Sequence, residues 1–371
     1  MSIRYLVVGA GISGAVIANL TSHNLDNQVT VIDSSDHIAG NCYDYRDENG
    51  IMIHKYGSHI FHTSNEKVWE FLNRFTTFNN YKHRVRAVIE GKEVPVPFDF
   101  DSIDQCFPQK TAKIIKDKLL DRFGYGARIP ICDFLEQEDD DLHSLAQYIY
   151  DNVFVNYTSK QWGKRPDELD GAVTARVPVS MSTDSGYFRD THEGIPSEGY
   201  SKMIENILDR PNIEVILRTA FSEIDIEGFE KIFYTGPVDE LMDYKFGELP
   251  YRSERFEMET HDMEHYQGLA VINYPNDHDY TRIHEYKYYL NDISSKTVIA
   301  KEYPEKFIVG KNERFYPIPD KENEELHRKI IEEAKKKYPN IYFLGRLGDY
   351  KYYDMDKAVA RAMDVYREAF Q

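Results

Sequence analysis

The chain has 371 residues, of which 45 are Lys or Arg and 63 are Asp or Glu, so its formal charge at pH 7 is −18. This acidity argues against nonspecific binding to nucleic acid or to an anionic membrane, and an anionic ligand would need arginines placed locally. Hydrophobic residues make up 41% of the sequence, which indicates a folded protein with two or three domains and excludes a disordered chain.

The cysteines and the N-terminus bear on the compartment. Cys42, Cys106 and Cys132 are an odd number without paired spacing, which indicates reduced thiols and no disulfide framework. The N-terminus has neither a long apolar run nor a small-residue cleavage site, so we expect no signal peptide and no membrane-inserted segment. These features predict a cytoplasmic protein.

The first predicted element is a buried parallel strand over residues 3–8, where the sequence is almost continuously apolar. It leads into Gly9, Gly11 and Gly14, which form G-x-G-x-x-G at the start of a predicted helix. Missing side chains at such positions let backbone N–H groups approach a pyrophosphate. A second apolar strand ends in Asp33, about twenty residues further on, where a carboxylate can bind a ribose hydroxyl. The pattern predicts a dinucleotide site without distinguishing FAD from NAD.

Two polar segments follow this strand. Gly40 and Asn41 lie in a turn that can pass under an adenosine or a flavin, although an ordinary loop would look the same. His59 and His62 have the spacing of half a metal site, but no cysteine or acidic cluster completes it, so we predict no metal. A histidine packed against a cofactor ring is the preferred interpretation, with structural burial as the alternative.

The segment from Ser102 to about Asn156 has a helical pattern. Its acidic stretch, residues 136–141, reads as a solvated loop before a helix. Four apolar residues of that helix are expected to share one face, namely Leu142, Leu145, Ile149 and Val153.

Two segments after it are candidate ligand contacts. Tyr157 and Trp162 flank a predicted polar turn in which aromatic rings can stack on a base or a sugar, or simply pack in the core. Arg176 follows in a stretch rich in Ser, Thr, Asp and Gly, which predicts a mobile segment able to close on a ligand.

The nucleotide-binding domain is expected to resume near Gly199 with a helix, a strand over about residues 213–218 and a second strand over about residues 230–234, and again after Asn323. Between these returns, four short alternating runs from Arg252 to Tyr303 predict an antiparallel sheet. Residues 345–356, "GRLGDYKYYDMD", read as a strand-to-helix turn of the nucleotide-binding sheet, with Asp354 or Asp356 as the helix cap.

Arg282 and Arg346 lie among apolar neighbours, where an arginine usually pairs with a carboxylate or phosphate of a ligand or with a structural partner. No Ser-His-Asp order, nucleophile elbow, C-x-x-C or H-E-x-x-H is present. A cofactor would therefore have to carry the chemistry.

Several motifs together resemble the UDP-galactopyranose mutase family across nearly the whole chain. They are "GAGISGAVIA", "DHIAGN", "HKYGSHIFHT", "YTSKQWG", "RVPVS" followed by "GYF", "YTGPVDE", "YRSERFE", "YTRIHEYKY" and "GRLGDYKYYDMD". The resemblance implies an α/β fold in three parts. A discontinuous Rossmann-like FAD-binding domain would comprise residues 1–80, 199–245 and 317–371, a helical domain residues 100–160, and an antiparallel β-sheet domain residues 81–99, 161–198 and 246–316.

The resemblance also implies an activity. It is that of an intramolecular transferase, an isomerase, which interconverts UDP-galactopyranose and UDP-galactofuranose through an adduct between the sugar and N5 of reduced flavin. FAD would be bound noncovalently and be active when reduced. The partners implied are a nucleotide-diphosphate sugar and a second copy of the chain in a homodimer, in the biosynthesis of cell-surface polysaccharide.

Site residues follow from the matching motifs. The resemblance implies catalytic roles for Arg176 and Arg282 at the diphosphate and for His62 near the flavin. Substrate contacts are implied for Tyr157 on the base, Trp162 near the sugar, Tyr187, Tyr316 and Tyr352 at the diphosphate, and for Asp354, Phe154 and Asn273. Cofactor contacts are implied for Gly9, Gly11, Ser13, Gly14, Asp33, Gly40, Asn41, His59, Ile60, Arg346, Tyr352, Asp354 and Met355.

The sequence departs from the family pattern at four positions, Ala39, His83, Val153 and Ser180. His83 and Val153 fall where sugar and base would be read, so dTDP-fucopyranose and UDP-N-acetylgalactosamine remain alternative substrates. A flavin-dependent oxidoreductase and a noncatalytic nucleotide-sugar binding protein are the alternatives from other classes.

Overall fold

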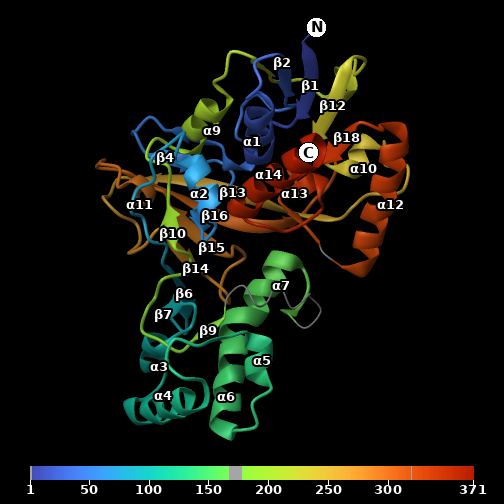
Figure 1. Ribbon diagram of the computed structural model, residues 1–371. Coiled ribbons are helices and arrows are strands. Elements are labelled where there is room, and N and C mark those ends of the chain that lie inside the picture. Colours follow the sequence, from blue (N-terminus) through green and yellow to red (C-terminus); the bar gives the residue numbers. More distant parts are fainter. Residues whose placement is uncertain (1, 167–177, 319) are drawn as a thin grey trace.

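The computed structural model describes residues 2–166, 178–318 and 320–371. Figure 1 shows three parts of the molecule: a parallel sheet with its helices at one end, a long sheet across the middle, and a group of helices at the other end. The predicted fold class is confirmed.

The parallel sheet has five strands in the order β11 (Ile213–Ile216), β2 (Asn27–Ile32), β1 (Ile3–Val8), β12 (Phe229–Tyr234) and β18 (Ile341–Phe343), and all neighbours run parallel. Its strands are apolar on both faces because both faces are covered. Val7 belongs to the core under α1 (Ile12–Thr21), α9 (Tyr200–Leu208) and α14 (Met355–Phe370), whereas Leu6 belongs to the core under α10 (Val238–Leu241) and α12 (Lys321–Lys337).

The central sheet has seven strands in the order β17 (Tyr316–Pro317), β13 (Tyr251–His261), β16 (Thr297–Lys306), β15 (Arg282–Glu285), β14 (Val271–Asn273), β6 (Val85–Ile89) and β7 (Lys92–Val96). All pairs are antiparallel except β14 with β6. The sheet is therefore mixed at one pair, because β6 and β7 form a hairpin from a distant part of the chain.

The helical group contains α3 (Phe100–Cys106), α4 (Gln109–Phe123), α5 (Ile131–Leu135), α6 (Asp140–Ile149), a π-helix (Tyr150–Val155) and α7 (Asn156–Trp162). It lies at the end of the molecule away from β1 (Figure 1). Asp139 caps α6 through the N–H groups of Asp141 and Leu142. The predicted polar turn at Tyr157 and Trp162 is wrong, because these residues lie on α7, which ends at Gly163 in the left-handed region (φ 68°).

The other described elements connect these parts. They are α2 (Glu66–Leu72), α11 (Lys287–Leu290), α13 (Gly345–Gly348), the 3-10 turns Gly40–Cys42 and Phe221–Glu223, and the strand pairs β3 (Asp44–Arg46) with β4 (Met52–His54), β5 (Phe61–Thr63) with β10 (His192–Gly194), and β8 (Arg128–Ile129) with β9 (Val179–Ser180). Of the described helices, none is both long enough and apolar enough to cross a bilayer.

The segment between β18 and α14 contains one short helix, α13, rather than a simple turn. Asp354 is the N-cap residue of α14, but its side chain makes no capping hydrogen bond. Asp356 lies in the first turn, where it accepts a hydrogen bond from Thr63 Oγ1 at 3.2 Å. The predicted side-chain cap is therefore wrong, although the helix begins where expected.

Candidate functional site

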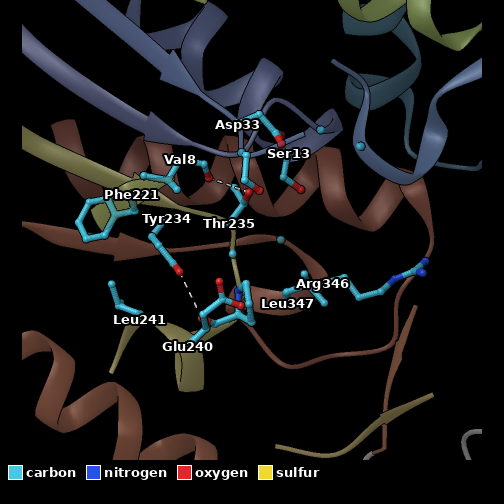
Figure 2. Close-up of a pocket in the computed structure, with 18 of the residues that line it drawn as sticks. Val8, Ser13, Asp33, Phe221, Tyr234, Thr235, Glu240, Leu241, Arg346 and Leu347 are labelled. Carbon is cyan, nitrogen blue, oxygen red and sulfur yellow. Dashed lines mark hydrogen bonds between the residues drawn. The ribbon is translucent and has the colours of Figure 1, made fainter. Parts of the chain in front are cut away.

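A cavity of about 640 Å³ lies at the carboxyl ends of β1, β2, β12 and β18. Ligands of open parallel sheets bind at this edge. Figure 2 shows Ser13, Asp33 and Thr235 close together near the strand ends, with Arg346 extending away from them. The glycine turn after β1 is fixed to its neighbours, since Gly9 N donates to Ile32 O at 2.7 Å and Thr235 Oγ1 donates to Val8 O at 2.8 Å.

Two glycines of this turn, Gly9 and Gly14, are required by close approaches of neighbouring atoms. A Cβ on Gly14 would lie 1.8 Å from Gly9 O, and a Cβ on Gly9, whose φ is +103°, would lie 2.0 Å from Thr235 Oγ1. Gly11 and Gly40 face each other, because a Cβ on Gly40 would lie 3.2 Å from Gly11 Cα. The start of α1 is thus bare backbone facing a cavity, which is the arrangement that binds a pyrophosphate.

Asp33 is held in a fixed orientation at the end of β2. Its Oδ2 accepts from Ala10 N at 2.7 Å, and its Oδ1 accepts from Ser35 N at 2.9 Å and from Ser35 Oγ. Oδ1 has two donors, so its lone pairs are used, whereas Oδ2 has one donor and keeps a further lone pair. The oriented carboxylate can therefore accept from the hydroxyls of a ribose.

Ala39 lines the same cavity in the left-handed backbone region, with φ 74°. A residue with a Cβ is strained there, whereas glycine is not.

We expect Ala39→Gly to raise the free energy of unfolding by about 0.5–1 kcal/mol, because relief of this strain outweighs the added flexibility of the unfolded chain. Denaturant unfolding measures the change. The matched control is Ala220→Gly, also at this cavity but in the extended region (φ −81°), which should lower stability. Equal effects at the two positions would contradict the strain argument.

A second cavity, of about 470 Å³, lies against one face of the seven-stranded sheet. Alternate residues of a strand point to the same face. Every strand of this sheet contributes lining residues, namely Tyr316, Glu254, Glu302, Arg282 and His284, Val271 and Asn273, Val85, and Val96. The helical group adds Val153 and Phe154 from the π-helix and Tyr157, Thr158, Gln161 and Trp162 from α7.

Aromatic rings form one corner of the second cavity. Trp162 meets Tyr352 edge to face with centroids 5.5 Å apart, and Tyr316 meets Tyr352 in the same way at 5.0 Å. The guanidinium of Arg346 lies 5.3 Å from the Tyr316 ring and donates to the backbone oxygens of Phe315 and Tyr353. Flat rings beside a fixed cation suit a ligand with a sugar or base and an anionic group.

Arg282 lies on β15 in a buried polar cluster. Its Nε donates to Glu302 Oε2 at 2.8 Å, and the same oxygen is 2.7 Å from His284 Nε2. Ser58 Oγ hydrogen-bonds the other ring nitrogen of His284 at 2.5 Å. The ion pair occupies Nε and leaves the two Nη groups of the fork, which no other described acceptor is seen to bind, for an anion. The two interpretations of this arginine, ion pair and ligand contact, are therefore compatible.

The two histidines of the predicted half-site have different surroundings. His62 Nδ1 is 2.8 Å from Asp190 Oδ2, and its ring stacks on Phe188 at 3.7 Å between centroids. His59 Nδ1 is 2.9 Å from Gly57 O, and burial together with nearby His54 lowers the pKa of His59 to about 3, so the ring is neutral. Within the described part of the chain, no group of three potential ligands could hold a metal ion.

Five residues line both cavities, which are therefore contiguous. They are Asn41, His59, Arg346, Asp354 and Met355. All five come from segments that we expected to contact the cofactor. A long ligand in the first cavity would present its far end to a ligand in the second.

The other residues that we expected at the site line one cavity or the other. Gly9, Gly11, Ser13, Gly14, Asp33 and Gly40 line the first, while His62, Phe154, Tyr157, Trp162, Tyr187, Asn273, Arg282, Tyr316, Tyr352 and Ile60 line the second. Ile60 and Tyr352, expected at the cofactor, are thus in the second cavity only. Arg176 lies outside the described residues. Of the four departures, Ala39 lines the first cavity, His83 and Val153 the second, and Ser180 neither.

Sequence reasoning missed the polar residues around Arg282, namely Ser58, Gln161, Glu254, His284 and Glu302. The alternation that predicted the strands also marks which residues share a face, but it does not say which strands are neighbours. Glu302 and Arg282 are directly opposite each other on β16 and β15. The available signal was a charged residue inside a predicted apolar strand, such as Glu302 within residues 297–304 and Arg282 within residues 280–289.

Two buried amide oxygens of the second cavity, Gln161 Oε1 and Asn273 Oδ1, have no hydrogen-bond partner among the described residues. Buried acceptors are costly when unpaired. A ligand with hydroxyl or N–H donors would satisfy them, which fits a sugar or a nucleobase.

Comparisons with known proteins agree with this arrangement. Residues 152–352 match the family described as UDP-galactopyranose mutase, and residues 7–75 match an NAD(P)-binding Rossmann-like domain. The chain is 38% identical to a probable UDP-galactopyranose mutase of Klebsiella pneumoniae, over 96% of this chain and 92% of that protein. It is 35% identical to a dTDP-fucopyranose mutase of Escherichia coli, over 97% of each.

Solved structures have the same fold. A crystal structure of reduced UDP-galactopyranose mutase matches 99% of this chain and 94% of that one with a TM-score of 0.72 and 15% identity. A redesigned putrescine oxidase matches 99% of both chains with a TM-score of 0.61 and 10% identity.

The sheet order, the glycine turn and Asp33 define a nucleotide-binding protein with a Rossmann-like domain. Its relatives at 32–38% identity over nearly the full chain are more specific. The chain belongs to the UDP-galactopyranose mutase family, whose members are isomerases.

Proposed function

We propose that the protein binds FAD and interconverts UDP-galactopyranose and UDP-galactofuranose. The observation that carries the proposal is the pair of contiguous cavities, one with a glycine turn and an oriented carboxylate, the other with aromatic rings and Arg282. A dinucleotide cofactor and a nucleotide sugar are two ligands that suit these linings and that would meet at the five shared residues.

The first cavity fits FAD on chemical grounds. The bare backbone at Gly11 and Gly14 suits the pyrophosphate, and Asp33 suits the ribose hydroxyls. His59 is neutral with Nδ1 bound to Gly57 O, so its Nε2 can accept a hydrogen bond at the junction. When bound and reduced, FAD supplies a nucleophilic nitrogen toward the anomeric carbon.

The residues of the second cavity would bind and orient the substrate. Arg282 offers its Nη groups to the diphosphate, and Arg176 is proposed as its second partner, since two phosphate charges are costly to desolvate unless paired. Tyr157 and Phe154 would contact the base, and Trp162 the sugar. The aromatic corner also excludes water, which protects a reactive sugar centre from hydrolysis.

The substrate is tested by incubating purified protein with dithionite and one nucleotide sugar, then separating the products by ion-exchange chromatography. We expect conversion of UDP-galactofuranose to UDP-galactopyranose with reductant and little conversion without it. Release of FAD on denaturation, seen in the absorbance spectrum, checks the cofactor. Conversion of another sugar but not of UDP-galactose would overturn the proposed substrate.

A second candidate substrate, dTDP-fucopyranose, is supported by the 35% identity to the Escherichia coli mutase over 97% of each chain. His83 and Val153, both at the second cavity, depart from the pattern that we associate with UDP-galactose. The same assay with dTDP-fucopyranose and UDP-N-acetylgalactosamine decides between them. Oxygen consumption during turnover would instead support a flavin-dependent oxidoreductase.

A further inference from the structure

Two buried carboxyl groups lie together at the second cavity. Glu254 on β13 is 8% exposed and Glu302 on β16 is 1% exposed. Glu254 pairs across the sheet with Pro304, two residues from Glu302, so both side chains lie on the face that lines the cavity. Glu302 is already the ion-pair partner of Arg282, whereas Glu254 has no part in the functions assigned above.

The partners of the two carboxyls differ in charge. Glu302 receives both strong donors of β15, Arg282 Nε and His284 Nε2. Glu254 receives the neutral amide of Gln161 from α7, with Gln161 Nε2 2.6 Å from Glu254 Oε1. Arg282, the fully charged cation of β15, therefore pairs with Glu302 and not with Glu254.

The protonation states follow from this geometry. Burial, together with the nearby charge of Glu302, raises the pKa of Glu254 to about 8. Burial would also raise the pKa of Glu302, but the Arg282 charge and the His284 hydrogen bond lower it below its usual range. Near neutral pH, Glu302 is therefore the anion and Glu254 the neutral acid.

The other titratable groups that face Glu254 do not change charge near pH 8. Burial lowers the pKa of His284 on β15 and raises the pKa of Tyr157 on α7 and of Tyr316 on β17. Arg282 and, on β13 itself, Arg252 stay charged throughout. Within this cluster, the charge between about pH 7 and pH 9 is set by Glu254.

We propose that Glu254 is a positioning residue that leaves Arg282 available to an anionic ligand only while the Glu254 carboxyl carries its proton. This inference rests on the proposed diphosphate ligand of the second cavity. A second carboxylate charge beside Arg282 would compete with the ligand phosphates for the guanidinium and would repel them. The ligand and the proton therefore bind with positive coupling, and by reciprocity ligand binding draws a proton onto Glu254.

The sign of the pH effect is fixed by this coupling. Below its pKa Glu254 is neutral and binding is tightest, and above it Glu254 is anionic and binding weakens. With a pKa of about 8, the dissociation constant should rise up to about tenfold from pH 7 to pH 9. The diphosphate of a nucleotide sugar does not titrate in this range, so the ligand phosphates contribute no slope of their own.

The experiment is calorimetric titration of the oxidised holoenzyme with UDP-galactose at about pH 7, 8 and 9. Glu254→Gln keeps the shape and cannot ionise, so we expect its dissociation constant to be the same at every pH. The matched control is Glu257→Gln on the same strand, whose carboxyl is 48% exposed and pairs with Arg255, and which should follow the unmodified protein. Repeating the titration at pH 8 in buffers of different ionisation enthalpy should show proton uptake that Glu254→Gln abolishes.

The outcomes separate the inference from the proposed function. UDP-galactose binding with one dissociation constant at every pH, or an equal pH slope in Glu254→Gln, would overturn the role of Glu254 alone. No binding at any pH would overturn the proposed function and the inference with it. If Glu254→Gln fails to fold, Glu254→Leu, which also lacks the charge, gives the same test. If Glu254 had only a structural role, these substitutions would change neither the pH dependence of the dissociation constant nor the proton uptake.

Discussion

Gly14→Ala is expected to abolish retention of the cofactor and to lower the free energy of unfolding by about 1–3 kcal/mol. Gly14 lies in α1, where helix propensity alone would favour alanine over glycine by about 1 kcal/mol. The close approach outweighs this gain, because the new Cβ would lie 1.8 Å from Gly9 O and 3.3 Å from Val7 Cγ1. To relieve this clash, α1 would have to move away from β1. The backbone N–H groups at the start of α1 would then no longer face the position of the pyrophosphate.

The measurement is the flavin absorbance per mole of purified protein, together with denaturant unfolding of the protein without cofactor. Gly268→Ala is the control, because a Cβ there would meet no atom within 4 Å and its φ is not in the left-handed region. A Gly14→Ala protein that keeps its flavin and its stability would contradict the close packing of α1 on the glycine turn.

The fold was largely predictable because its strongest patterns are local. The apolar strand before Gly9 and the second apolar strand that ends in Asp33 each identify an element without knowledge of the rest of the chain. The error at Tyr157 has a local cause as well. Ser, Thr, Asn and Gly around this residue favour a turn. Burial of Thr158 and Trp162, and the hydrogen bond from Gln161 to Glu254 on the sheet, hold the segment as α7.

The glycine turn could be predicted from the sequence, whereas the contacts of the Arg282 cluster could not. Gly14 closes on Gly9 O within the same short motif, so the spacing of the glycines encodes this part of the site. The cluster depends on register: Arg282 meets Glu302 only because β15 and β16 pair as they do, and Gln161 reaches Glu254 from a helix about ninety residues earlier. Such contacts between distant segments are fixed by tertiary packing and leave no periodic signal.

The cluster gives the second large prediction. Arg282→Met should lower the free energy of unfolding by about 3 kcal/mol, near the low end for a broken buried ion pair. Glu302 would keep only the neutral donors His284 and Thr281, while Arg282 itself is 27% exposed. It should also weaken UDP-galactose binding by about 2–5 kcal/mol, since the diphosphate loses a desolvated guanidinium. Denaturant unfolding and calorimetric titration measure the two effects separately.

The double variant Arg282→Met with Glu302→Gln distinguishes the structural role of the arginine from its role toward ligand. Removing both charges leaves no unpaired buried ion, so most of the lost stability should return, whereas the affinity should stay at least about 30-fold below that of the unmodified protein. Recovery of both would mean that Arg282 serves only to neutralise Glu302. Recovery of stability alone would mean that the ion pair exists to hold the Arg282 fork at the cavity, where its Nη groups are needed for an anion that the overall negative charge of the chain would otherwise repel.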